Sequence, residues 1–159
     1  MNYISTRNKS LNFDFSSIFL RGLAPDGGLF LPNKIKKFSE NELKELSQLN
    51  YIDLGVEIIS GFCTPVLNKN KIKLILNKAY SSFDTKNIVE IKKIDNINLL
   101  ELYHGPTLAF KDIAMQVIGN MYENILEKSK LKVNVVVATS GDTGAAAISA
   151  IKNRKNMKI

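Results

Sequence analysis

The sequence predicts an α/β protein in which a mainly helical N-terminal domain precedes the start of a domain built on a parallel β-sheet. Up to about residue 83, apolar residues recur mostly at helical spacing. From residue 88 onward, short β-branched runs alternate with helix-like segments. Strand–helix–strand–helix order is typical of a parallel sheet covered by helices. We therefore expect one domain over residues 1–84 and a second over residues 85–159.

The expected N-terminal domain consists of short helices separated by turns. Ser39, followed three residues later by Glu42, has the pattern of a capping box and predicts a helix through Leu49. A Thr64-Pro65 pair predicts another helix start, with Thr as the cap and Pro in the first turn. The remaining helices are expected over residues 13–21, 53–61 and 71–83.

The expected second domain opens with two strands on either side of a polar turn at Asp95-Asn96. A long helix with one apolar face and a valine-rich strand follow, and an alanine-rich helix leads to the start of a further strand. In chain order, these elements are expected at residues 88–91, 99–103, 110–127, 133–137, 145–151 and 156–159.

Lys111 is the most informative single residue, because it stands where a strand-like run is followed by a helix. It belongs to residues 104–112, His-Gly-Pro-Thr-Leu-Ala-Phe-Lys-Asp. We expect it in the first helical turn, where the helix dipole disfavours a cation by roughly 0.3–1 kcal/mol. Such a lysine loses its proton more readily, as Schiff-base chemistry requires. The alternative is a surface lysine lying past apolar neighbours. Asp112 is expected to point away from the apolar face.

A second segment, residues 138–144 (Ala-Thr-Ser-Gly-Asp-Thr-Gly), lies between the valine-rich strand and the last helix. Turns at the carboxyl ends of parallel strands commonly hold ligands, and free amides at a helix start favour a carboxylate or phosphate. The simpler alternative is a turn in which Asp142 or Thr143 caps the helix. The glycine spacing matches neither a dinucleotide-binding fold nor a P-loop, which argues against an NTPase.

Composition excludes several classes of function. The net charge is +7, but the 22 basic residues are scattered, and no zinc-finger spacing, RNA-binding motif or basic helix occurs. No apolar run approaches the ~20 residues that span a bilayer, and no signal peptide is evident. With a single cysteine, the chain is expected to be cytoplasmic. We expect no metal site in the chain, and we expect neither nucleic acid nor a membrane as its partner.

Residues 104–112 and 138–144 closely resemble signature segments of the threonine synthase family. Its members are pyridoxal-phosphate enzymes of the tryptophan-synthase-β-like fold. Residues 3–7 and 22–29 also resemble the N-terminal domain of that family, in the same order along the chain. Asp142, where related lyases, dehydratases and sulfhydrylases usually have Asn, favours the threonine-synthase branch. The resemblance assigns residues 1–84 to the family's N-terminal domain and residues 85–159 to the beginning of an incomplete catalytic domain.

The resemblance also implies roles for individual residues. In that family the lysine matching Lys111 carries pyridoxal 5'-phosphate as a Schiff base and, once released by the substrate amine, moves protons as general base and acid. Asp142 is expected near the phenolic oxygen of the cofactor. His104 is expected to be a structural hydrogen-bonding residue, and Arg7 with Ser5 is a weaker candidate for the substrate-phosphate side. The substrate carboxylate is expected at Ser140, Gly141, Thr143 and Gly144.

The implied reaction converts O-phospho-L-homoserine and water into L-threonine and phosphate. Family members are much longer than 159 residues, and neither their glycine-rich phosphate loop nor the residue facing the pyridine nitrogen is found here. We therefore expect a fragment that binds the cofactor poorly by itself and turns over nothing measurable. Two alternatives stay open, a non-catalytic truncated remnant and a pyridoxal-phosphate-dependent phospho-lyase of the same family. The sequence gives no indication of oligomeric state.

Overall fold

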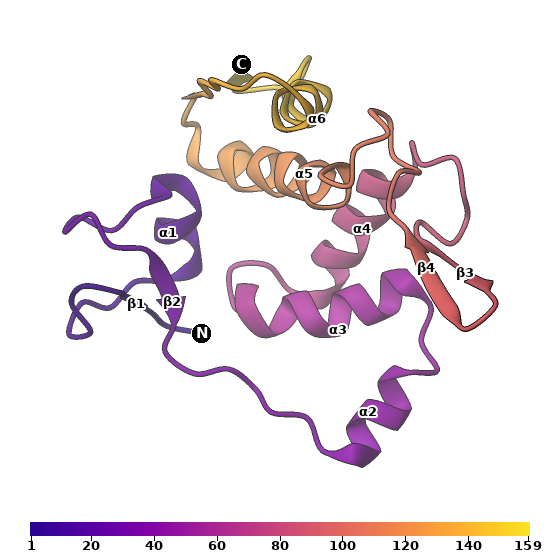
Figure 1. Ribbon diagram of the computed structural model, residues 1–159. Coiled ribbons are helices and arrows are strands. Elements are labelled where there is room, and N and C mark those ends of the chain that lie inside the picture. The colour runs from indigo at the N-terminus through magenta and orange to yellow at the C-terminus, as the bar shows by residue number, and fades with distance from the viewer. The chain divides into compact units, whose positions relative to one another are not determined.

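The computed structural model describes all 159 residues and divides into two compact units, Met1–Leu74 and Ile75–Ile159. Six helices and three two-stranded sheets make it a mixed α/β structure, which confirms the expected fold class. The domain boundary near residue 84 stays a prediction. In chain order (Figure 1) the elements are β1 (Tyr3–Ser5), α1 (Phe15–Arg21), β2 (Phe30–Pro32), α2 (Glu40–Leu46), α3 (Tyr51–Cys63), α4 (Lys69–Tyr80), β3 (Glu90–Ile94), β4 (Ile97–Glu101), α5 (Asp112–Ser129), β5 (Val133–Asn134), α6 (Asp142–Ile151) and β6 (Met157–Lys158).

The N-terminal unit contains a small sheet that the sequence did not predict. Strand β1 pairs antiparallel with β2, so that Tyr3 lies opposite Pro32 and Ser5 opposite Phe30. The Tyr3 hydroxyl donates to the Phe62 carbonyl at 2.8 Å, which attaches the sheet to the end of α3. A three-residue strand is too short to show an alternating pattern, so only the pairing reveals it.

Two helices of this unit form largely as their local sequence predicts. Helix α1 ends at Gly22, whose φ of +74° is a left-handed conformation that glycine adopts without strain. Helix α2 carries the predicted capping box: Ser39 accepts from the Glu42 amide while the Glu42 carboxylate accepts from the Ser39 amide. The helix ends at Leu46 rather than at Leu49, and it buries no residue.

The prediction that a helix starts at Thr64-Pro65 is wrong. Thr64 instead ends α3: its amide and its hydroxyl both donate to the Ser60 carbonyl, at 3.2 and 2.9 Å. The Thr64–Pro65 peptide is cis. Helix α4 begins only at Lys69, where the Asn68 side chain accepts the amide of Lys71 at 2.9 Å. One helix therefore replaces the two expected between residues 64 and 83.

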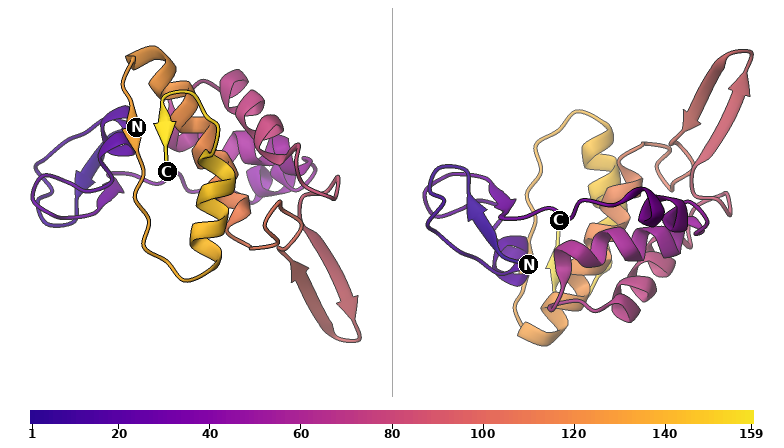
Figure 2. Two further views of the ribbon diagram at one scale, coloured as in Figure 1. Left: turned by 90° about the horizontal axis from the view of Figure 1, so that it is seen from above. Right: turned by 90° about the horizontal axis from the view of Figure 1, so that it is seen from below.

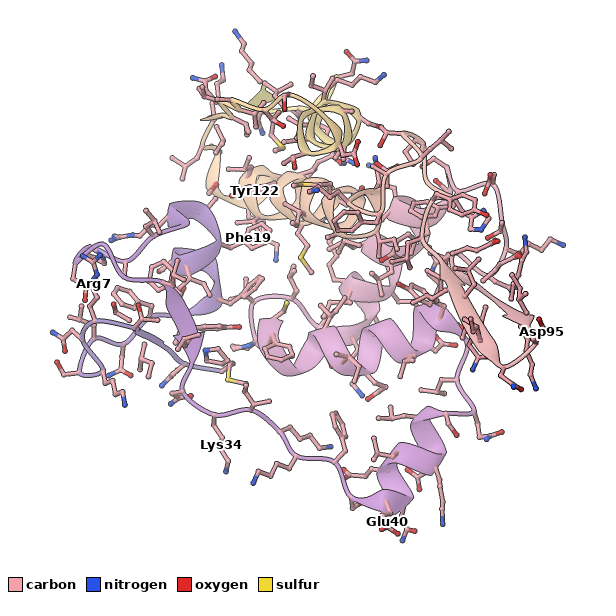
Figure 3. All side chains as sticks on the ribbon, in the orientation of Figure 1. Arg7, Phe19, Lys34, Glu40, Asp95 and Tyr122 are labelled. Carbon is pink, nitrogen blue, oxygen red and sulfur yellow. The ribbon has the colours of Figure 1, made fainter.

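In the second unit, β3 and β4 form an antiparallel hairpin around the predicted Asp95-Asn96 turn. Asp95, labelled at the hairpin tip in Figure 3, has a positive φ of 51°, which Asp tolerates better than most residues. Strand β3 starts at Glu90 rather than at Ile88, which has a positive φ of 68°. Strand β4 covers residues 97–101 rather than the predicted 99–103. Glu90 and Glu101 lie opposite each other at the base of the hairpin.

The remaining elements form a β5–α6–β6 unit beside α5. Strands β5 and β6 pair in parallel, as predicted, but β5 covers two residues rather than five. Gln116 of α5 bonds Ser149 of α6 at 3.2 Å, and Arg154, after α6, bonds Asn120 of α5 at 3.0 Å. Contacts therefore advance together along both helices, so α5 and α6 run in the same general direction (Figure 2). No helix is both long and apolar enough to cross a membrane.

Candidate functional site

Lys111 lies at the junction between an irregular segment and α5. It occupies the position just before the helix, with φ −66° and ψ −20°, so it precedes the first turn instead of belonging to it. Its side chain is half-buried, and the ammonium nitrogen lies 4.3 Å from the centre of the Phe110 ring. This separation is within the range of a cation–π interaction. The amine therefore rests on an exposed aromatic face at the start of the helix.

Asp112, the residue after Lys111, is fully buried, which corrects the prediction that it points away from the apolar face. Its two carboxylate oxygens accept from the amide and the hydroxyl of Thr107, at 2.7 and 2.8 Å. These bonds satisfy a carboxylate that has lost its contact with water, and burial without them would be strongly unfavourable. The Asp112–Thr107 pair therefore closes the loop that ends at Lys111.

Gly105 and Leu108 shape the same loop. A Cβ atom on Gly105 would lie 2.4 Å from Cβ of Asp112, so only glycine allows this approach. The Leu108 amide donates to the Gly105 carbonyl at 3.0 Å, and Leu108 has a positive φ of 60°. We call residues 104–112 the lysine segment. Its backbone is folded tightly around the Asp112 side chain.

His104 connects the lysine segment to the hairpin. Its Nδ1 lies 3.0 Å from Oδ1 of Asp84, and its Nε2 lies 3.1 Å from Oε2 of Glu101. Lys92 in turn lies 2.8 Å from Oε1 of Glu101, and this contact, with the Tyr103 hydroxyl, lowers the pKa of Glu101 below its ordinary value. Both ring nitrogens of the buried His104 thus have partners, which gives the residue a structural place in the fold.

One group of side chains at the hairpin base has the composition of a metal site. One potential ligand atom from each of Glu90, Glu101 and His104 lies within 4.8 Å of the others. Lys92 already supplies a positive charge to Glu101, and His104 is engaged by two carboxylates. Glu101 and His104 therefore already have polar partners within the protein.

The second candidate segment, residues 138–144, lies at the start of α6, and we call it the glycine segment. Ser140, Gly141 and Asp142 are exposed, while Thr143 is half-buried and Gly144 is buried. No side chain caps α6, so the simpler alternative, in which Asp142 or Thr143 caps this helix, is wrong. Asp142 is instead the first residue of the helix. Uncapped amides at a helix start are suited to bind an anion.

Gly144 allows the glycine segment to fold back on α6. A Cβ atom at this position would lie 2.4 Å from the Thr139 methyl group. The Gly144 and Ala145 amides donate to the Gly141 carbonyl, at 3.0 and 3.3 Å. The Gly141 amide has only a long bond, 3.4 Å, to the Thr139 hydroxyl. The segment is therefore held mainly by backbone bonds to the Gly141 carbonyl, and its side chains add only this long bond.

The packing of α5 on α6 relates the two segments. Because the two helices run in the same general direction, the lysine segment before α5 and the glycine segment before α6 lie toward the same end of the pair. A lysine amine and a set of free amides with neighbouring hydroxyls can together hold an amino acid or another small anionic molecule.

The weaker candidates Ser5 and Arg7 belong to the N-terminal unit. Ser5 is fully buried and donates to Oδ1 of Asp26 at 2.7 Å, while it accepts the Arg7 amide at 3.1 Å. The Arg7 guanidinium, at the labelled loop in Figure 3, donates to the Asp26 carbonyl at 3.0 Å. Ser5 has a structural role, and Arg7 has an exposed cation fixed by one contact.

Sequence reasoning missed Thr107 and misplaced Asp112. An acidic residue in the first turn of a helix is common, because it interacts favourably with the helix dipole. The position of Asp112 therefore gave no reason to predict that its carboxylate is buried. The one signal in the sequence for a buried Asp112 was Gly105. A glycine beside a proline can allow close packing of another residue as well as a turn. Its second use, contact with Asp112, depends on the folded loop.

Comparisons with known proteins agree on one family. A family model described as "Threonine synthase N terminus" matches residues 2–80. The chain is 40% identical to a threonine synthase of Methylobacillus glycogenes over 169 aligned residues, covering 100% of the chain and 35% of that protein. It is 38% identical to a threonine synthase-like 2 protein of Xenopus laevis over 161 residues, covering 100% of the chain and 34% of that protein.

A solved structure of threonine synthase from Brucella melitensis with bound pyridoxal phosphate resembles the chain with a TM-score of 0.93 and 35% identity. The match covers 99% of this chain and 34% of that one. The chain thus spans about a third of the length of the curated relatives that it matches. It belongs to the threonine synthase family and corresponds to the N-terminal portion of its members.

Proposed function

We propose that the chain supplies the lysine-bearing part of a threonine synthase, which converts O-phospho-L-homoserine and water into L-threonine and phosphate. The observation that carries the proposal is the place of Lys111, on a loop closed by the buried Asp112–Thr107 pair. The match to a threonine synthase solved with pyridoxal phosphate supports the choice of cofactor and reaction.

The residues of the two segments fit this cofactor and substrate. Lys111 is half-buried and makes no ion pair, so its amine is available to hold pyridoxal phosphate covalently. Asp142 is exposed at the start of α6, beside the free amides. The substrate carboxylate would be held at Ser140, Gly141, Thr143 and Gly144. Ser140 and Gly141 are exposed there, whereas the amide of the buried Gly144 already donates to the Gly141 carbonyl.

Each residue has a limited chemical task in this proposal. When bound, pyridoxal phosphate supplies an electron sink for negative charge developing at substrate carbons. The Nζ atom of Lys111, when free, would accept and return protons at those carbons. The amides at the start of α6 orient the substrate through its carboxylate. Asp142 would lie near the phenolic oxygen of the cofactor.

The proposal is tested by reducing the chain with borohydride in the presence of pyridoxal phosphate and mapping the labelled peptides. We expect the total label to be small. The share on Lys111 should nevertheless exceed the share on any other of the 19 lysines. Lys111→Met should remove this preferred label. Lys128→Met, an exposed position in the last turn of the same helix, is the matched control and should leave it unchanged.

A label spread evenly over the lysines would contradict the proposal. A second arm examines the substrate. The amines of both enantiomers of O-phosphohomoserine compete for the cofactor, but the L-enantiomer should reduce the label on Lys111 more than the D-enantiomer does, because a chiral site holds one enantiomer better. Equal protection by phosphorylated amino alcohols would favour the phospho-lyase alternative instead.

A further inference from the structure

Asp112, the residue after Lys111, is a charged residue whose side chain is buried. Asp112 has no exposed surface, and both of its oxygens accept hydrogen bonds from a single residue, Thr107. Buried carboxylates are usually paired with a cation. Here two donors from a neighbouring loop residue take that place.

The pair closes a short loop around the lysine. Thr107 and Asp112 are five residues apart, and Lys111 is the last residue inside the closed loop. The Leu108 amide bonds the Gly105 carbonyl at 3.0 Å, and the Asp112 amide bonds the Ala109 carbonyl at 3.0 Å. Every turn of the loop is therefore held, either by backbone bonds or by the Asp112 carboxylate.

The direction of the Lys111 side chain follows from this closure. Asp112 is fixed inside the fold, and the Lys111 carbonyl accepts the Met115 amide at 2.9 Å as the helix begins. Because these contacts hold the backbone on the C-terminal side of Lys111, its Cα–Cβ bond has one orientation. A flexible four-carbon side chain then starts from a fixed origin, which reduces the entropy lost when its amine is held.

We infer that Asp112 and Thr107 are positioning residues, which present the Lys111 amine to the cofactor by fixing the loop between them. The inference rests on the proposed function, since it assumes that Lys111 is the residue which holds pyridoxal phosphate. Neither residue needs to touch the cofactor. Loss of their contact lets the loop open and spreads the amine over many orientations.

The test uses two substitutions of Thr107 in the full chain. Thr107→Val removes the hydroxyl bond to Asp112 with little change of shape, while Thr107→Ser keeps the hydroxyl. After reduction with pyridoxal phosphate and borohydride, we expect Thr107→Val to lower the share of label on Lys111 about tenfold, as loss of a bond to a charged acceptor implies. Thr107→Ser should stay within about twofold of the unsubstituted chain.

A matched control separates positioning from general loss of stability. Thr64→Val removes a hydroxyl bond of similar length, 2.9 Å to the Ser60 carbonyl, in the N-terminal unit. We expect it to leave the share of label on Lys111 unchanged. An unchanged share in Thr107→Val, or an equal fall in both valine variants, would overturn the inference.

Amide hydrogen exchange gives a readout that needs no cofactor. In Thr107→Val, the Leu108 and Asp112 amides should exchange about tenfold faster, while the Met121 amide within α5 should not change. Unchanged exchange at both loop amides would also overturn the inference. Failure of the proposed function looks different, because the unsubstituted chain would then show no preference for Lys111.

Discussion

The lysine segment and the glycine segment both precede a helix, yet they are held in opposite ways. In the lysine segment, the fully buried Asp112 gathers two hydrogen bonds from Thr107, and Gly105 packs directly against it. In the glycine segment, Ser140 and Asp142 are exposed, and no side chain caps α6. The same local pattern, a turn leading into a helix, therefore gives one rigid loop and one open loop.

The difference shows how work is divided at a site of this kind. A residue that holds a cofactor covalently benefits from a fixed origin, since each freely rotating bond lowers the fraction of productive orientations. A segment that binds an anion through amides and hydroxyls needs these groups to be free of other partners. Rigidity before α5 and unpaired donors before α6 suit these two tasks.

The largest test of this comparison replaces the two aspartates. Asp112→Ala removes two hydrogen bonds to a buried carboxylate and leaves the Thr107 donors without partners, so we expect a loss of about 2–4 kcal/mol in the free energy of unfolding. Asp142→Ala changes an exposed residue and should stay within about 0.5 kcal/mol. Urea unfolding of both variants measures the contrast. Similar losses would remove the distinction between the segments.

Glycine substitutions give an intermediate effect. A Cβ atom at Gly105 or at Gly144 would lie 2.4 Å from its nearest neighbour, but the neighbours differ. Gly105→Ala would meet Cβ of the buried Asp112 and should cost about 1–3 kcal/mol.

In Gly144→Ala the new atom meets only the methyl group of the exposed Thr139, which can move, and Ala gains about 1 kcal/mol of helix propensity over Gly. We therefore expect the net change in the free energy of unfolding to be within about 1 kcal/mol. Thermal unfolding of both variants is the measurement. A Gly144→Ala variant as unstable as Gly105→Ala would mean that the glycine segment is rigid as well.

The smallest expected effect is the change of stability with pH. It arises at the base of the hairpin, where His104 of the lysine segment contacts Glu101. The hydrogen bond from Lys92 lowers the pKa of Glu101 below its ordinary value of 4.5 in the folded chain. The associated stability is therefore fully present above about pH 5 and is lost as the pH falls through the lower, folded pKa.

We expect the unfolding temperature to fall on acidification below about pH 5, and to fall less steeply in Lys92→Met, which lacks the ammonium partner. Lys93→Met is the matched control, since Lys93 lies on the opposite face of the same strand. It should follow the unsubstituted chain. A pH dependence that is identical in all three proteins would show that the Lys92–Glu101 contact contributes nothing.

The sequence by itself determined the elements whose signals are local. The apolar stripe of α5, the capping box at Ser39 and the turn at Asp95-Asn96 each depend on residues a few positions apart, and all three are present. The two motif segments were likewise recognisable from their residues alone. Periodicity and capping are properties of one stretch of chain, so no knowledge of the rest is needed.

Tertiary structure decided the features that need a partner distant in sequence or a particular loop path. Strand β1 exists because β2 lies beside it, and β5 ends after Asn134 because β6 pairs with only two of its residues. Asp112 looked like an ordinary helix-start residue until the loop brought Thr107 to both of its oxygens. Burial of a polar group depends on where its partners come to lie, and residue type with spacing does not specify that position.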